Sequence, residues 1–173
     1  MANTDLNIEY YRKAKSVFLY DKTTGKLIRR IDRKRYKKGS VLKGTISKTG
    51  YLVTQVGLNK KYKFIKMHRL IFFICHGTLP KVIDHIDGNP LNNKIENLRE
   101  CTQSQNTMNS KLSKNNTSGR VGVRQIKKTG NWVAIIMVNR KKIHIGTFPT
   151  FELACRAREK AEIKYFKNFR RKM

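Results

Sequence analysis

The sequence predicts an α+β protein with a β-rich N-terminal region, a central strand–strand–helix segment, and a separate three-stranded antiparallel sheet packed on one helix. Short apolar runs bounded by turn residues dominate residues 1–66. A polar segment, 84–106, then carries closely spaced carboxylate, imidazole and amide side chains. After residue 117 the strand pattern restarts, and it ends in a helical pattern.

The N-terminal half reads as hairpins followed by a helix. Asp21–Gly25 is a turn between two apolar runs, which is a hairpin pattern. Farther on, aromatic or aliphatic residues alternate with lysine, as in a half-exposed strand. Gly77 ends the helical spacing that follows. The predicted elements are strands at 17–20, 26–29, 50–56 and 62–66 and a helix at 67–76.

The central segment predicts two strands and a helix. Asp84 ends a short apolar strand, and a loop at 87–93 is rich in Asp, Gly, Asn and Pro, which favour tight turns. Residues 97–101 are the predicted returning strand, and Thr102 is a suitable N-cap for a helix. We expect Asn106 on the first turns of that helix, facing back toward Asp84.

The last third predicts a sheet backed by a helix. Apolar runs near 121–124, 131–137 and 142–146 alternate with turns, and Thr150 caps a helix with an apolar stripe. The predicted organisation is therefore a basic β-rich region at 1–49, a central domain at 50–112, a linker at 113–117, a sheet-and-helix domain at 118–168 and a basic tail at 169–173.

Charge is distributed unevenly along the chain. The formal net charge is +28 on 173 residues, with +16 over residues 1–83, zero over 84–116 and +12 over 117–173. Such an excess indicates a polyanionic partner. A protein that only coats nucleic acid has little reason to neutralise one central segment, whereas a metal-dependent nuclease needs oxygen ligands there. The alternative is a generally basic protein with a chance neutral stretch.

The residues of the neutral segment suit metal-assisted phosphodiester cleavage. Asp84 and Asn106 offer oxygen ligands, His85 offers an imidazole base, and Asn97 offers an amide that can fix a turn. A hard divalent ion prefers oxygen ligands and retains several waters, so we expect Mg²⁺, with Mn²⁺ as the alternative. An imidazole that is largely neutral at pH 7 can deprotonate an attacking water.

The cysteines Cys75, Cys101 and Cys155 stand alone, with no Cys-x-x-Cys pair. We therefore expect neither a disulfide framework nor a structural zinc site. No apolar run is long enough to span a bilayer, and the first residues lack an export-signal pattern. The expected partner is double-stranded DNA and not a membrane, and the expected location is a reducing cytoplasm.

Residues 50–110 closely resemble HNH nucleases of the phage and intron-homing type. The matching residues are His68-Arg69-Leu70, Asp84-His85-Ile86-Asp87-Gly88-Asn89, Asn92-Asn93, Glu96-Asn97-Leu98-Arg99 and Asn106. The resemblance implies a ββα-metal fold in which Asp84 and Asn106 bind the ion, His85 is the base, and Asn97 braces the loop. The family's last ligand is often histidine, and Asn106 in its place weakens zinc relative to magnesium. For His68, a structural role is the alternative to a catalytic one.

Residues 118–166 resemble the Apetala-two (ethylene-response-factor) DNA-binding domain. The matching residues are Ser118-Gly119-Arg120-Val121-Gly122-Val123-Arg124, Trp132-Val133-Ala134, Ile145-Gly146-Thr147-Phe148 and Ala154 to Ala161. That family lays a three-stranded sheet in the major groove. The resemblance implies DNA contacts at Arg120, Arg124, Trp132, Arg140 and Lys142. Core packing is the alternative for Trp132.

A basic run in the N-terminal region is the other predicted DNA surface. Its residues are Arg29, Arg30, Arg33, Lys34 and Arg35. Such side chains can follow the phosphate backbone, although a solvated charged face is the alternative.

Taken together, the sequence predicts a monomeric, site-specific DNA endonuclease or nickase of phage or mobile-element origin, which would act in the cytoplasm of a bacterial host. Two other classes fit the charge. A non-catalytic DNA-binding regulator would use only the C-terminal domain, and an RNA-binding structural protein would leave the central motif unexplained.

Overall fold

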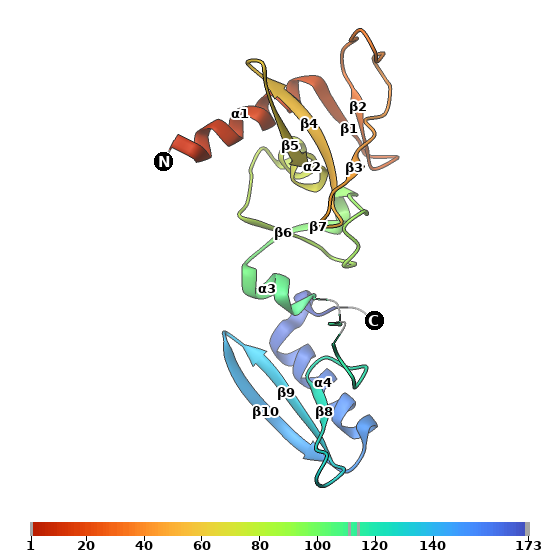
Figure 1. The fold of residues 1–173 in the computed structure, drawn as a ribbon, viewed down its shortest axis with the longest axis vertical. Coiled ribbons are helices and arrows are strands. Elements are labelled where there is room, and N and C mark those ends of the chain that lie inside the picture. The colour runs from red at the N-terminus through yellow and green to blue at the C-terminus, as the bar shows by residue number, and fades with distance from the viewer. Residues whose placement is uncertain (1, 111, 114, 172–173) are drawn as a thin grey trace. The chain divides into compact units, whose positions relative to one another are not determined.

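The computed structural model describes residues 2–110, 112–113 and 115–171, with the side chains of the first helix described from Ile8 onward. Lys111, Lys114, Lys172 and Met173 of the predicted segments lie outside the described residues. The chain forms two compact units, Met1–Glu100 and Cys101–Met173. The division falls within the predicted 50–112 segment, so we describe each unit by itself (Figure 1).

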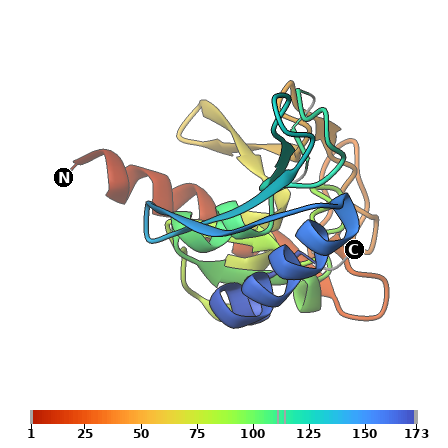
Figure 2. The same cartoon turned by 90° about the horizontal axis from the view of Figure 1, so that it is seen from below.

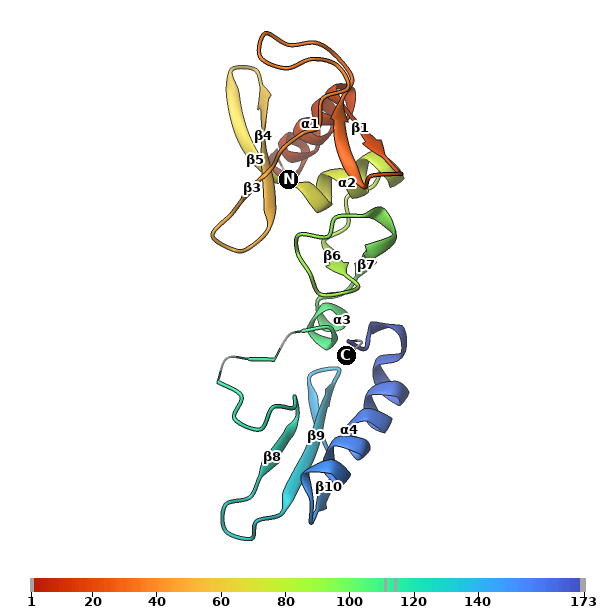
Figure 3. The ribbon, with the colours of Figure 1, turned by 90° about the vertical axis from the view of Figure 1, so that its right-hand side faces the viewer.

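The first unit combines helices with small antiparallel sheets (Figures 1 and 3). Its elements in chain order are α1 (Ala2–Val17), β1 (Phe18–Asp21), β2 (Lys26–Arg29), β3 (Thr45–Ile46), β4 (Leu52–Leu58), β5 (Lys61–Lys66), α2 (Met67–His76), β6 (Val82–His85), the 3₁₀ turn η1 (Ile95–Asn97) and β7 (Leu98–Cys101).

Strand pairing in this unit confirms the predicted hairpins. β1 pairs with β2, β4 lies between β3 and β5, and β6 pairs with β7. Asn59 and Lys60 both have positive φ at the β4–β5 turn, which matches the right-handed twist of a two-residue hairpin. α2 also has the predicted bounds, and Gly77, at φ 74°, closes it by donating its N–H to Phe73 O.

Helix α1 is an element that the sequence analysis did not predict. Ala14 lies four residues after Tyr10 and three residues after Tyr11, so the three side chains share one face of the helix. All three are buried. Ile8 and Val17 pack, partly buried, against the same core, and the other residues between them are polar or charged. The apolar stripe is therefore short, which hides it from a search for longer apolar patterns. The N-terminal region is therefore a helix followed by strands.

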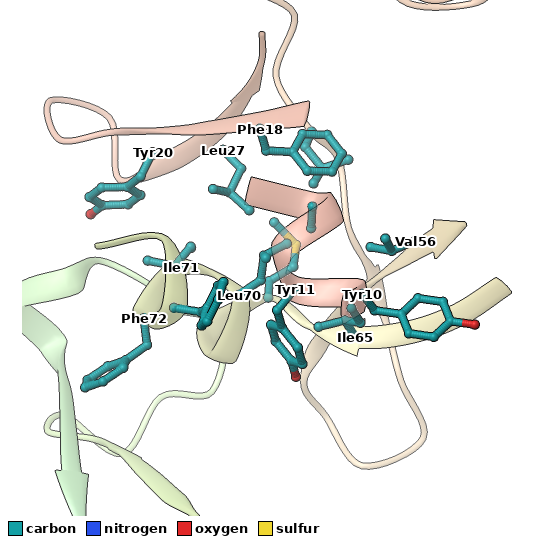
Figure 4. Close-up of a cluster of buried hydrophobic side chains, with 14 of the residues drawn as sticks. Tyr10, Tyr11, Phe18, Tyr20, Leu27, Val56, Ile65, Leu70, Ile71 and Phe72 are labelled. Atoms are coloured by element: carbon teal, nitrogen blue, oxygen red, sulfur yellow. The ribbon is translucent and has the colours of Figure 1, made fainter. Parts of the chain in front are cut away.

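One hydrophobic core joins the N-terminal region to the central hairpin. Leu27 of β2 and Leu70 and Ile71 of α2 are almost fully buried in it (Figure 4). The rings of Tyr11 and Phe73 pack at a tilt, with 5.7 Å between their centroids. Ile83 of β6 and Leu98 of β7 belong to the same cluster. Packing against α1 and α2 thus supports the strands that carry the predicted catalytic residues.

The second unit contains α3 (Gln103–Met108), β8 (Val123–Gln125), β9 (Trp132–Val138), β10 (Lys141–Phe148), α4 (Phe151–Phe166) and η2 (Lys167–Phe169). The strands form an antiparallel sheet in the order β10–β9–β8, and α4 packs against it (Figure 2). This arrangement confirms the predicted three-stranded sheet on one helix.

Local signals placed both helices of this unit correctly. Thr102 Oγ1 accepts from Gln105 N, and Gln105 Oε1 accepts from Thr102 N, so a capping box starts α3. Thr150 Oγ1 accepts from Leu153 N at the start of α4. Within the part of the chain that is described, no helix is long and apolar enough to cross a membrane.

Candidate active site

The end of β6 carries the two central residues of the predicted site. Asp84 and His85 are 5% and 6% exposed, although both are polar. Burying such groups is costly unless they are hydrogen-bonded or paired. Each of them has specific partners from the β6–β7 hairpin and its loop.

Asp84 is paired with Arg99 of β7. Arg99 Nη2 lies 2.7 Å and Arg99 Nε 2.9 Å from the same carboxylate oxygen, Asp84 Oδ2. Two charge-assisted hydrogen bonds from a half-buried guanidinium offset the desolvation of the carboxylate. The pair also fixes the carboxylate across the two strands of the hairpin.

His85 is held by Asn93 of the loop. His85 Nε2 lies 2.9 Å from Asn93 Oδ1, and both side chains are buried. If the amide oxygen accepts, Nε2 carries the proton and the imidazole tautomer is set. The side chain of Asn93 therefore orients the ring of the predicted base.

Asn97 ties the loop to the start of β7. Its Oδ1 accepts from Asp87 N at 3.0 Å, and its Nδ2 donates to Asp87 Oδ1 at 3.0 Å and to Asn92 O at 2.8 Å. A backbone hydrogen bond from Ile86 N to Asn97 O, at 2.9 Å, closes the same junction between the loop and β7. These are the contacts expected of a residue that braces the loop.

Asp87 is the anchor of the loop and not a second acidic residue facing a ligand. Burial alone would raise the pKa of Asp87, but hydrogen bonds from Asn89 N, Asn92 Nδ2 and Asn97 Nδ2 outweigh it, so the pKa lies below its usual value. The carboxylate is thus kept ionised to hold the turn.

Two aromatic rings, those of His68 and Tyr51, also pack near the His85 ring. His68 of α2 meets it edge-on at 4.9 Å between centroids, and Tyr51 packs 5.1 Å from His68 and 6.1 Å from His85. Burial lowers the pKa of His68 to about 3, with further lowering from His85, Lys66 and Arg69. His68 is therefore a neutral packing partner, which is the structural alternative considered above.

Asn106, the other predicted oxygen ligand, lies on α3 in the second unit. The capping box of Thr102 and Gln105 fixes the first turn of this helix, on which Asn106 N donates to Thr102 O. Asp84 and Asn106 belong to different units, so their joint binding of one ion stays a prediction. A carboxylate and an amide oxygen are donors that suit Mg²⁺. Among the described residues, no group of three or more His, Cys, Asp or Glu side chains could hold a metal.

The basic run of the first unit is mostly solvent-exposed. Arg30, Arg33, Lys34 and Arg35 are exposed, as expected of phosphate contacts. Arg29 differs, because its guanidinium carbon lies 3.9 Å from the centre of the Tyr36 ring.

In the second unit, the predicted DNA residues separate into two groups. Arg124, Arg140 and Lys142 are exposed. Trp132 packs edge-on against Phe151 at 4.8 Å between centroids, which is the packing alternative named above.

Arg120 belongs to a buried ion-pair network. Its Nη2 lies 2.8 Å from Glu162 Oε2, and Arg158 Nε lies 2.9 Å from Glu162 Oε1. Arg158 also donates to Ile135 O of β9. The loop before β8, helix α4 and the sheet are thereby held together, and the DNA contact of Arg120 stays a prediction.

Gly122 lets that loop approach the network. It has φ 74°, and a Cβ there would lie 2.4 Å from Ile135 O. Glycine tolerates this positive φ and has no Cβ to clash with the carbonyl oxygen, so no other residue fits here. The residues that carry the resemblance around 118–122 therefore serve the fold of this unit.

Sequence reasoning did not assign roles to Arg99, Asn93 or Tyr51. Arg99 and Asn93 were part of the matched motif, so their position beside Asp84 and His85 was a usable signal. Tyr51 had no such signal, because it reaches His68 only through the pairing of β4 with β5 and the turn into α2.

Comparison with known proteins agrees with this geometry. A family model described as HNH endonuclease matches residues 66–108, which include α2, the β6–β7 hairpin and α3. The chain is 37% identical over 123 residues to DNA endonuclease I-HmuI of Bacillus phage SP01, covering 69% of this chain and 68% of that protein. It is also 37% identical over 83 residues to Protein 3.8 of Escherichia phage T7, covering 47% of this chain and 69% of that protein.

Two further similarities were found. An uncharacterized HNH endonuclease of Acanthamoeba polyphaga mimivirus is 36% identical over 118 residues, which cover 66% of this chain and 58% of that protein. A solved structure of DNA binding and cleavage by the HNH homing endonuclease I-HmuI aligns over 85% of this chain and 82% of that chain, with 25% identity and a TM-score of 0.43. The sequence similarity to I-HmuI and the family match, both of which include Asp84, His85 and Asn97, lead to one conclusion. This chain belongs to the HNH endonuclease family.

Proposed function

We propose that this protein is a site-specific DNA endonuclease that hydrolyses phosphodiester bonds with a divalent metal ion. The observation that carries the proposal is the buried Asp84–His85 pair, with Arg99 on the carboxylate and Asn93 on the imidazole. A structural hairpin has no need to bury a carboxylate and an imidazole side by side. The similarity to a phage DNA endonuclease supports the same activity and a phage or mobile-element origin.

The protein's own residues would divide the chemistry between them. His85, oriented by Asn93, would accept a proton from the attacking water. Asn97 would keep the loop closed, so that the imidazole stays within reach of that water. Arg99 would hold the Asp84 carboxylate in place.

Asp84 and Asn106 would hold the metal, with DNA phosphate and water completing its shell. Mg²⁺, or Mn²⁺ in its place, would neutralise charge on the scissile phosphate and on the leaving 3′ oxygen. The expected products carry 5′-phosphate and 3′-hydroxyl ends.

We further propose that the second unit recognises DNA through the face of its sheet that points away from α4. Residue pairing places Met137 beside Lys142 and Val133 beside Arg124 on that face, and His144 pairs with Ile135 there. Arg124, Lys142 and His144 are exposed, and Met137 is 52% exposed. Basic, polar and apolar side chains on one face suit contacts to phosphates and base edges. The resemblance to the Apetala-two domain supports the same use, with double-stranded DNA bound by a monomer in the host cytoplasm.

A supercoiled-plasmid assay tests the activity. Purified protein should convert the plasmid to nicked or linear forms with Mg²⁺ and not with EDTA. His85→Ala should lower the rate by about 10²–10⁴-fold, as loss of a general base does, with DNA affinity retained. DNA binding without any metal-dependent cleavage would instead favour the non-catalytic regulator.

A further inference from the structure

A pocket of about 350 Å³ opens in the first unit, away from the catalytic hairpin. It is bounded by α1, by the β1–β2 hairpin and the residues that follow it, and by β4 and the β4–β5 turn. No residue of β6, β7 or their connecting loop lines it. Its volume falls at the lower end of the range for small-ligand sites.

Four cationic side chains from separate segments line this pocket. They are Lys13 of α1, Arg29 of β2, Arg33 of the following loop, and Lys60 of the β4–β5 turn. No Asp or Glu is among the lining residues. None of the ion pairs found among the described residues includes any of the four. Their mutual repulsion is therefore offset by no carboxylate in the pocket wall.

Arg29 is held rigidly at this pocket. Its guanidinium lies 3.9 Å from the centre of the Tyr36 ring and 5.5 Å from that of Phe18, and its backbone N–H donates to Ser40 O. Stacking on two aromatic rings fixes the plane of the guanidinium and removes the flexibility that an exposed arginine has.

The Nε atom of Arg29 is buried and has no hydrogen-bond partner among the described residues. A buried donor without an acceptor is costly, because it has lost its water. An oxyanion at the edge of the guanidinium would supply the missing acceptor. A guanidinium edge matches two oxygens of a phosphate group, and lysines nearby add charge without demanding geometry.

We propose that this pocket binds one phosphate group, separately from the scissile phosphate. The group is either a backbone phosphate of the bound DNA or the phosphate of a free anion such as a nucleotide. The first source rests on the proposed DNA-binding function, and the second does not. In both cases Arg29 is the central ligand, and Arg33, Lys13 and Lys60 surround it.

The test uses the whole chain, two pocket variants and one control variant. Arg29→Gln and Arg33→Gln each remove one pocket cation. Lys22→Gln is the control, because it removes the same charge from the far end of the same hairpin, outside the pocket. Thermal melts verify that each variant folds. If Arg29→Gln unfolds because the contact with Tyr36 is lost, Arg33→Gln alone tests the pocket.

Calorimetry with inorganic pyrophosphate in metal-free buffer is the first readout. The wild type and Lys22→Gln should bind it equally, and the pocket variants should bind it about 10-fold or more weakly, as expected when a hydrogen bond to a charged group is lost. No pyrophosphate binding by the wild type, or equal weakening in all three variants, would overturn the proposal.

Duplex-DNA affinity across a KCl series then identifies the source of the phosphate. If the phosphate belongs to DNA, Arg29→Gln should reduce the log–log salt slope by about one, the value for one lost phosphate contact. If it belongs to a free anion, pyrophosphate binding falls while the slope is unchanged. Failure of plasmid cleavage with pyrophosphate binding intact would reject the nuclease and not the pocket.

Discussion

The imidazole of His85 contacts both an amide side chain and an aromatic ring. Asn93 contacts Nε2 and His68 meets the ring edge-on. Both neighbours act at the level of single side chains, and each gives a separate experimental consequence. One concerns rate, and the other concerns stability at low pH.

Asn93→Ala should slow cleavage by about 10–100-fold, which is the usual loss when a residue that orients a catalytic side chain is removed. The ring of His85 would lose its partner while the chemistry of the base is unchanged. Single-turnover plasmid nicking measures the rate, and gel shift should show unchanged affinity.

Asn92→Ala is the matched control, because Asn92 lies next to Asn93 in the same loop and its Nδ2 donates to Asp87 Oδ2. Asn92→Ala should lower the free energy of unfolding but should change the nicking rate little. A nicking rate for Asn93→Ala equal to that of the wild type would show that Asn93 does not position the base.

His68 should make stability depend on pH in the acidic range. The folded protein keeps this imidazole neutral down to a pKa of about 3, whereas the unfolded chain protonates it below 6.5. Because the unfolded state then binds the extra proton, stability should fall as pH drops from 6.5 toward 3, by up to about 1.4 kcal/mol per pH unit.

Urea unfolding of the wild type and of His68→Phe, from pH 7 to pH 4, measures this contribution. Phenylalanine keeps an aromatic ring and cannot titrate. The free energy of unfolding should decline less steeply in the variant. Parallel curves for the two proteins would mean that His68 is not buried as a neutral ring.

At the scale of elements, the β6–β7 hairpin depends on Asn97. Three hydrogen bonds join this side chain to Asp87 and Asn92, and the side chain is 8% exposed. Asn97→Ala removes these three part-buried hydrogen bonds, at a cost of about 1–3 kcal/mol.

A lower melting temperature and a lower nicking rate should therefore appear together in Asn97→Ala. Differential scanning calorimetry and the plasmid assay measure the two effects. Asn115→Ala, at an exposed position, should change neither. If the melting temperature of Asn97→Ala matched that of Asn115→Ala, the bracing role would be excluded.

Elements defined by local signals were predictable, and those defined by distant contacts were not. Thr102 and Thr150 marked helix starts because a cap involves residues three apart, and Gly77 marked a helix end for a similar reason. Helix α1 was missed because its apolar stripe is short. The positions of Asp84, His85 and Asn97 followed from one motif within a single hairpin.

Side-chain partners showed the limit of sequence reasoning. The ion pair of Arg120 was not predictable, because its partner, Glu162, lies 42 residues away and is reached only through the fold. Trp132 was ambiguous, since a strand pattern does not say which face α4 covers. Arg29 was one of five basic residues in a run, and only packing distinguishes it from its neighbours.

At the scale of the whole molecule, the division of the chain after Glu100 assigns α3 to the second unit. Met108 of α3 packs on a core that contains Ile136, Ala161 and Phe166. A cut in the predicted linker would therefore separate α3 from the residues that support it, although the sequence alone places α3 with the hairpin.

A fragment that begins at Cys101 should be more stable than one that begins at Leu112. Keeping Met108 half-buried is worth about 1 kcal/mol, which corresponds to about 4–8 °C in a domain of this size. Circular dichroism melts of the two fragments test this, with Met108→Ala in the longer one as control. Equal melting temperatures would mean that α3 adds nothing to this unit.

Asp and Glu number only 11 in this chain, and several of these carboxylates have partners within the fold. Asp84 and Glu162 hold buried guanidinium groups, Asp87 holds a loop, and Asp21 and Asp32 accept hydrogen bonds from nearby backbone N–H groups. Few carboxylates are left to neutralise the exposed lysines and arginines. The surface of the protein is therefore strongly cationic and binds anions from solution. During purification it should therefore carry host nucleic acid, with a high ratio of absorbance at 260 to 280 nm, until concentrated salt displaces that polymer.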